Sequence, residues 1–167
     1  MRTILAIFVC KLVTKLCRIL GRNGSVYPGE IVFDFIDRNI LDKIKYPPLV
    51  IAITGSSGKG STTEAIAHIL KDNHYDVCYN QNGSNGILAA MTLILNNCNY
   101  KGVFKHEVLL LECDERHLKL IFKKQKMTHL VITNVTRDQP ARIGHPYCVF
   151  RDIKEAIYNC LILVRNA

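Results

Sequence analysis

The sequence predicts an α/β fold, with a parallel sheet that carries helices on both faces and an N-terminal helical segment before it. Two observations support this prediction. From residue 49 onward, short apolar runs alternate with helix-like stretches, which is typical of parallel sheets. Before residue 48 the apolar positions repeat at helical spacing instead. We therefore divide the chain into a helical segment, 1–47, and a sheet domain, 48–167.

Composition and charge restrict the class of protein. Hydrophobic residues make up 49% of the 167 residues, which excludes a disordered chain. The formal net charge is +8, and no acidic residue precedes Glu30. This basic excess predicts an anionic partner. No recognition motif accompanies it, so we expect no nucleic-acid binding. The seven cysteines include no C-x-x-C pair, which predicts reduced thiols in a cytoplasmic protein.

The stretch from Thr3 to Leu20 predicts a basic amphipathic helix. Basic residues at 11, 15, 18 and 22 repeat at helical spacing, and the other side holds Leu5, Phe8, Val9, Leu12, Leu16 and Ile19. The lysines leave no apolar span near the roughly 20 residues that cross a bilayer. Two interpretations stay open: the helix lies on an anionic membrane surface, or it docks on the protein with its basic face in water. The pattern favours docking.

The remaining elements follow from their residues. A second helix is expected over Glu30–Ile44, ended by two prolines. The aliphatic run Leu49–Thr54 predicts a strand, and a helix begins near Ser61. Further strands are expected at 75–79, 107–112 and 129–134, with helices at 87–95, 114–125 and 152–165. Ligands collect at the carboxyl ends of parallel strands, and four polar clusters fall there: 55–62, 80–85, 112–114 and 134–138.

The stretch Gly55–Thr62 predicts a phosphate-binding loop. Its glycines let backbone N–H groups approach an anion, and the following helix adds its partial positive charge. Lys59 is placed to contact the outer phosphates. Gly60 stands where a magnesium-binding hydroxyl is usual, so Ser61 is the candidate replacement. The alternative is a tight turn with a solvated lysine.

Glu112 is the candidate magnesium ligand, because it ends an apolar strand beside this loop and offers a hard oxygen donor. The alternative is an acid that only caps the next helix. Cys113 is expected to be a packing thiol. Asp138 lies in the last of the four polar clusters and is either a site residue or a solvated loop acid.

These clusters resemble the Mur ligase family of ATP-dependent amide-forming enzymes. The resemblance rests on the run Thr54–Lys59 with hydroxyls after it, on a strand that ends in Glu112, and on Thr133-Asn134 with Asp138 beyond. It is nearest to the MurT-type branch, through Leu20–Ser25, Pro28-Gly29, the Asn80-x-x-Gly-x-Asn85 pattern and Arg137–Gln139. The resemblance implies a central domain like that of P-loop NTPases.

The resemblance also implies an activity. Members of the family use ATP and Mg²⁺ to activate a carboxylate as an acyl phosphate, which an amine or ammonia then attacks. In the MurT-type branch the carboxylate belongs to the D-glutamyl residue of lipid II, the lipid-linked peptidoglycan precursor. A glutamine amidotransferase subunit of the GatD type supplies the ammonia.

Carried over by position, the resemblance assigns four groups of residues. Lys59 and Asp138 would be catalytic, and Ser61 and Glu112 would bind the metal. The nucleotide would be bound by Gly55, Ser56, Ser57, Gly58, Lys59, Gly60, Ser61, Thr62, Asn85 and Asn134.

Other functions stay open. The chain would alternatively be a non-catalytic nucleotide-binding module, or another Mur-type ligase such as a relative of folylpolyglutamate synthase. A GTPase is disfavoured because there is no N-K-x-D motif. The sequence ends inside a helical stretch where a full family member continues, so we expect this chain alone to be incomplete and inactive. Its expected location is the cytoplasm, at the inner face of the membrane.

Overall fold

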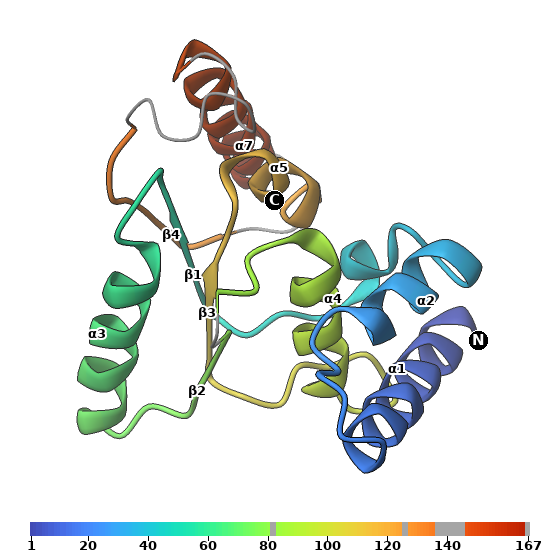
Figure 1. The fold of residues 1–167 in the computed structure, drawn as a ribbon. Helices are drawn as coiled ribbons and strands as arrows, with labels where there is room; N and C mark the ends of the chain where they lie inside the picture. The colour runs from blue at the N-terminus through green and yellow to red at the C-terminus, as the bar shows by residue number, and fades with distance from the viewer. Residues whose placement is uncertain (81–82, 125–126, 136–145, 166–167) are drawn as a thin grey trace.

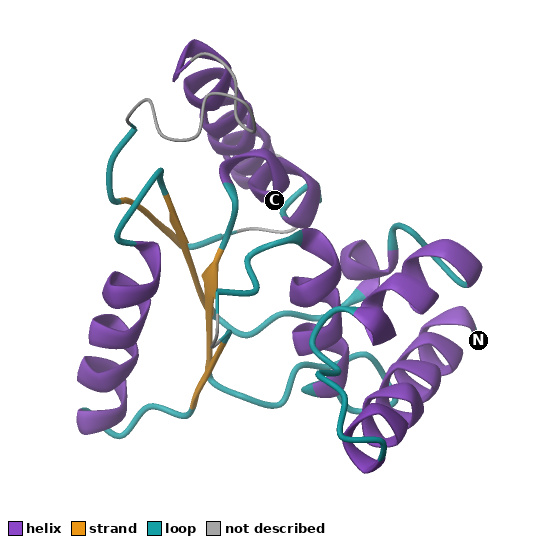
Figure 2. Ribbon diagram, in the orientation of Figure 1, coloured by secondary structure: helices purple, strands orange, loops and turns teal. Residues whose placement is uncertain are grey.

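The computed structural model describes residues 1–80, 83–124, 127–135 and 146–165. In this part of the chain, four parallel strands form one sheet in the order β2-β3-β1-β4. Helices lie on both faces of the sheet (Figures 1 and 2), so the predicted fold class is confirmed. The strands are β1 (Leu49–Thr54), β2 (Val77–Tyr79), β3 (Val108–Glu112) and β4 (His129–Ile132).

The sheet separates two hydrophobic clusters. Side chains alternate along β1, so Ile51 and Ile53 pack on the side of α3 (Lys59–Asp72), and Val50 and Ala52 pack on the opposite side. The opposite face is covered by α4 (Ile87–Asn96) and α5 (Glu115–Ile121). Burial on both faces explains why β1 and β3 are almost entirely apolar.

The N-terminal helices form a further layer outside α4 (Figure 1). They are α1 (Arg2–Ile19) and α2 (Tyr27–Phe35). Buried Ala6 and Val32 belong to the same hydrophobic cluster as Leu109 of the sheet. The last helix, α7 (Pro146–Arg165), packs on α5, where Lys119 pairs with Asp152 at 3.0 Å and with Glu155 at 2.8 Å. The proposed boundary at residue 47 stays a prediction.

Helix α1 docks on the protein, as the pattern favours, but not through the apolar side that the sequence predicts. The face against the protein consists of Ala6, Ile7, Cys10, Thr14 and Cys17. The small side chains on this face let α1 approach its neighbours closely. The hydroxyl of buried Thr14 is satisfied within the helix, because it donates to Cys10 O at 2.8 Å. The predicted basic face is only partly in water, because Lys11 Nζ donates to Cys98 O at 2.6 Å.

The opposite face of α1 stays exposed, although it is apolar. Leu5, Phe8, Leu12, Leu16 and Ile19 are between 44% and 70% exposed. The helix therefore has two apolar faces, of which the fold buries one.

The single helix predicted over Glu30–Ile44 is wrong. Helix α2 ends at Phe35, and a separate 3₁₀ turn, η1, spans Ile40–Lys43. Asp37 is the cause, because its side chain accepts the Asn39 N–H at 3.0 Å and also pairs with Lys43. Such local bonds to an Asp side chain compete with continued helix.

Other boundaries shift by a few residues. The helix predicted at 114–125 is shorter, because Asp114 is its N-cap and Phe122 its C-cap; residue 125 lies outside the described part. The helix predicted to start at Asp152 begins at Pro146, since proline suits the first helical position. The strand predicted to reach Asn134 ends at Ile132.

The described cysteines carry free thiols, and five of them are buried: Cys10, Cys17, Cys78, Cys98 and Cys113. Their burial agrees with their positions inside apolar stretches of the sequence. Within the described ranges, none of the helices combines the length and the apolar character that a membrane span requires.

Candidate functional site

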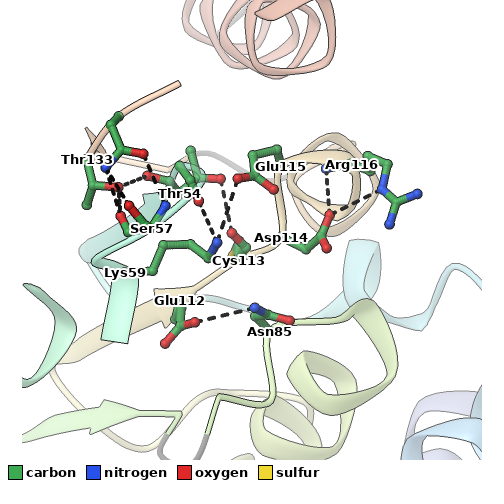
Figure 3. Close-up of polar contacts among 12 residues, drawn as sticks. Thr54, Ser57, Lys59, Asn85, Glu112, Cys113, Asp114, Glu115, Arg116 and Thr133 are labelled. Carbon is green, nitrogen blue, oxygen red and sulfur yellow. Dashed lines mark hydrogen bonds and ion pairs between the residues drawn. The ribbon is translucent and has the colours of Figure 1, made fainter. Parts of the chain in front are cut away.

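The predicted phosphate loop joins β1 to the N-terminus of α3 at the carboxyl edge of the sheet (Figure 3). Thr62 donates the first hydrogen bond of the helix, to Gly58 O at 3.0 Å. In the described part of the chain, the N–H groups of Lys59, Gly60 and Ser61 have no backbone acceptor. Such amide groups at a helix N-terminus form a binding site for anions.

Two glycines give the loop its shape. Gly58 has φ +79° and open space beside it, a backbone conformation that glycine adopts without strain. Gly55 has φ +131°, and a Cβ there would lie 2.3 Å from Thr133 Oγ1. The loop is therefore pressed against the residues that follow β4.

Asn134 holds the phosphate loop in place. Its Oδ1 accepts the Ser57 N–H at 3.1 Å, and its Nδ2 donates to Ser57 Oγ at 3.0 Å. Thr133 Oγ1 adds a bond to Ser57 O at 2.7 Å. The sequence predicts that Asn134 contacts the nucleotide, whereas in the structure its side chain is bonded to Ser57 of the loop.

Lys59 folds back over the loop and faces a buried carboxylate. Its Nζ donates to Gly55 O and lies 3.7 Å from Glu115 Oε1. The Glu115 side chain is 2% exposed, and its Oε1 has no hydrogen-bond partner among the described residues. A buried carboxylate requires a nearby counter-charge, which Lys59 supplies. Glu115 was not among the predicted site residues, because an acid in the first turn of a helix has an ordinary explanation.

Glu112 lies between the phosphate loop and the loop after β2. Its Oε1 accepts a hydrogen bond from Asn85 Nδ2 at 3.4 Å (Figure 3). A Cβ at Gly60 would lie 3.4 Å from Glu112 Oε2. Two separately predicted residues, Asn85 and Glu112, are therefore in contact, and the start of α3 lies beside them. Ser61 follows Gly60 in the first turn of α3 and is exposed.

Asn80 fixes the end of β3 that carries Glu112. Its Oδ1 accepts the Glu112 N–H at 2.7 Å, and its Nδ2 donates to Glu112 O at 2.9 Å. The Nδ2 also donates to Ser84 O at 2.9 Å. Because β2 ends at Tyr79, the Asn80 side chain replaces the strand that would pair with Glu112. The sequence indicates this residue only as part of a loop pattern.

The two residues that follow Glu112 have structural roles. Asp114 accepts the Arg116 N–H at 3.0 Å as the N-cap of α5. Cys113 is fully buried, and burial, with a smaller effect of the flanking carboxylates of Glu112 and Asp114, raises the pKa of its thiol. A thiol that stays protonated is no nucleophile, so Cys113 is the packing residue that the sequence predicts.

The described residues include no cluster of three His, Cys, Asp or Glu side chains that would hold a metal. Besides Glu115, which pairs with Lys59, the described residues offer one carboxylate beside the loop, that of Glu112 near Gly60. That donor set fits Mg²⁺, which takes one or two carboxylates and completes its shell with phosphate oxygens and water. Asp138, the other predicted catalytic residue, lies outside the described residues.

The chain is similar in sequence to MurT subunits of lipid II isoglutaminyl synthase (glutamine-hydrolyzing). It is 31% identical to the protein from Staphylococcus aureus (strain COL) over 163 residues, 95% of this chain and 36% of the relative. It is 34% identical to the protein from Streptococcus pneumoniae (strain ATCC BAA-255 / R6) over 138 residues, 83% of this chain and 30% of the relative. The chain thus spans about a third of these relatives. No family model matches the sequence.

Solved structures of MurF ligases have a similar fold. MurF from Acinetobacter baumannii has a TM-score of 0.58 at 19% identity, over 75% of this chain and 28% of that one. MurF from Thermotoga maritima in complex with ADP has a TM-score of 0.54 at 25% identity, over 68% of this chain and 26% of that one. Sequence and fold together confirm the expected resemblance of this chain to the Mur ligase family and, within it, to the MurT-type subunits.

Proposed function

We propose that this chain is the ATP-binding part of an ATP-dependent carbon–nitrogen ligase that modifies a peptidoglycan precursor. The main support is one arrangement: a loop with unbonded amide groups and Lys59 on one side, and the Glu112–Asn85 pair on the other. The similarity to MurT subunits favours amidation of the D-glutamyl carboxylate of lipid II. The ADP bound to the MurF ligase from Thermotoga maritima favours ATP as the nucleotide here.

Each residue has a role in this proposal. The amide groups of Lys59, Gly60 and Ser61 hold phosphate oxygens, and the Lys59 ammonium neutralises their charge. Glu112 and the Ser61 hydroxyl hold Mg²⁺, which would supply further positive charge to the phosphates. Asp138 is assigned to the reacting end by resemblance alone.

The reaction has two steps in this proposal. The substrate carboxylate attacks the outer phosphorus of ATP, and ADP leaves as the acyl phosphate forms. Ammonia then attacks the acyl carbon, phosphate leaves, and the amide loses a proton. Orientation of three reactants contributes roughly 7–11 kcal/mol to lowering such a barrier. A glutamine amidotransferase partner of the GatD type would supply the ammonia.

The exposed apolar face of α1 supports a peripheral contact with the inner face of the cytoplasmic membrane. Phe8, Leu12 and Leu16 lie on this face, with Lys15 beside them. The absence of acidic residues before Glu30 makes this segment complementary to anionic lipid. A second copy of the chain would instead bring like charges together. A lipid-linked substrate would be reached from this surface.

The proposal is tested by ATP binding. Lys59→Ala would leave buried Glu115 without its counter-charge, so the decisive variant is Lys59→Met/Glu115→Gln. Loss of the charge-assisted contact should weaken ATP binding by about 1.5–3 kcal/mol in calorimetry. Glu115→Gln alone is the matched control, because it keeps the lysine and should bind ATP at least as tightly as wild type. Equal affinity of the double variant and the control would contradict the assignment.

A further inference from the structure

A polar cavity lies at the C-terminal end of α1, apart from the phosphate loop. Its volume is about 360 Å³, and α1, the loop that follows it, α4 and the loop after β2 line it. Among the described residues that line it, Arg18 and Arg22 are the only charged ones. The rest of the lining is rich in amide and hydroxyl groups, including Asn80, Ser84 and Asn96.

The two arginines have no counter-charge in the described part of the chain. No carboxylate there forms an ion pair with Arg18 or Arg22. Two unpaired guanidinium groups at one cavity attract an anion, and each presents a planar fork of N–H donors that suits phosphate oxygens.

The backbone keeps the two arginines close to each other. Helix α1 ends with Arg22 N–H donating to Cys17 O at 2.8 Å and Gly21 N–H donating to Arg18 O at 3.1 Å. Gly21 has φ +65°, as expected at the end of a helix. The loop then returns to α1, since a Cβ at Gly24 would lie 3.0 Å from Cys17 Cβ.

The walls of the cavity are tied to the candidate site. Asn80, which lines the cavity, bonds the backbone of Glu112. Ser84 also lines a neighbouring cavity of about 400 Å³, together with Asn85 and Asp114. The two cavities share Ser84 and Ala89, and the second one reaches Asn85, which donates to Glu112. A substrate bound along both cavities would place one end at the arginines and the other end near the reacting groups.

We propose that the cavity at Arg18 and Arg22 binds a diphosphate group of the carboxylate substrate, while the ATP phosphates occupy the loop 55–62. This inference rests on the proposed function. A lipid-linked diphosphate would meet the cavity at the surface of the membrane, because the exposed apolar face belongs to the same helix. The shared chemistry is a diphosphate, whether it is free or lipid-linked.

The test is site-resolved binding of diphosphate by NMR. The ¹⁵N-labelled 167-residue chain, saturated with ADP to fill the loop, is titrated with inorganic pyrophosphate and, separately, with geranyl diphosphate as a soluble lipid-linked form. Both should shift the amide signals of residues 22–25. Tighter binding of geranyl diphosphate assigns the lipid-linked form as the better ligand, and equal binding assigns the diphosphate alone. Either result supports the cavity.

Two double variants separate this site from general charge attraction. Arg18→Gln/Arg22→Gln should weaken pyrophosphate binding at least about tenfold and leave ADP binding unchanged. Lys15→Gln/Lys101→Gln removes the same charge from exposed positions outside the cavity and should change binding less than about twofold. Equal weakening by both pairs would overturn the inference. Pyrophosphate shifts that are confined to residues 55–62 would also overturn it. A third titration uses phosphatidylglycerol vesicles, and the inference is equally wrong if these vesicles alone shift the signals of residues 22–25. If the wild-type chain does not bind ADP, the proposed function is refuted instead.

Discussion

Asn80→Ala should destabilise the fold and disturb the candidate metal ligand at the same time. The Asn80 side chain is the partner of both the N–H and the C=O of Glu112, at 2.7 and 2.9 Å. Residue 80 is only 7% exposed, so water cannot readily replace the lost amide. The substitution therefore leaves two buried backbone groups at the end of β3 without partners.

The expected cost follows from these contacts. A buried polar group without a partner costs about 1–3 kcal/mol, so the pair should cost about 2–4 kcal/mol in the free energy of unfolding. A typical domain has about 5–15 kcal/mol of stability, so the variant should still fold. Because the end of β3 carries the Glu112 side chain, ATP affinity should fall more with Mg²⁺ present than with Mg²⁺ absent.

Urea unfolding followed by circular dichroism measures the first effect, and calorimetry with and without Mg²⁺ measures the second. Asn73→Ala is the matched control, because Asn73 is exposed and makes one side-chain bond, to Ile69 O at 2.8 Å. Its cost should stay within about 0.5 kcal/mol. If both variants lose the same stability, the role given to Asn80 is wrong.

Three further predictions address the loop, the core and α1. Gly60→Thr should strengthen ATP binding only when Mg²⁺ is present, because the new hydroxyl lies near a carboxylate oxygen; an equal gain without metal would point to loop conformation instead. Burial raises the pKa of Cys10 and Cys98 from 9.0 to about 12. The unfolded chain therefore loses these thiol protons at a lower pH than the folded chain, so stability is full below pH 9 and falls between pH 9 and 12. Urea midpoints should drop over that range, and they should drop less steeply in Cys98→Ala. A flat profile in wild type would refute this. Phe8→Ser/Leu12→Ser should keep the fold and abolish flotation with phosphatidylglycerol vesicles, and retained flotation would exclude this face as the membrane contact.

Local sequence patterns predicted the sheet and the loop well. The aliphatic run of β1 and the glycines after it are compatible with only a few backbone arrangements. The strand, the loop and the helix could therefore be predicted directly from this stretch. The parallel order of β2, β3, β1 and β4 then brought Asn85 beside Glu112, as the shared edge of a sheet requires.

The sequence could not reveal which contacts form between distant segments. Helix α1 has apolar side chains on two faces, and periodicity alone could not show that the face with Ala6 and Cys10 would be buried. The pair between Lys59 and Glu115 joins residues far apart in sequence. The turn at Asp37 depends on one side chain, and that effect is local and easily outweighed by apolar spacing.

The unequal hydrophobic clusters on the two faces of the sheet affect how the molecule opens. On the α3 side, the fully buried helix positions are only Thr63 and Ala67, and Ile69 is 61% exposed. Local opening needs least energy where few apolar contacts are broken. Helix α3 should therefore detach from the sheet more easily than the layers on the other face. The phosphate loop leads into α3, so an anion held there would be released when the helix detaches. Anion binding would therefore stabilise the attached state of the least firmly held helix.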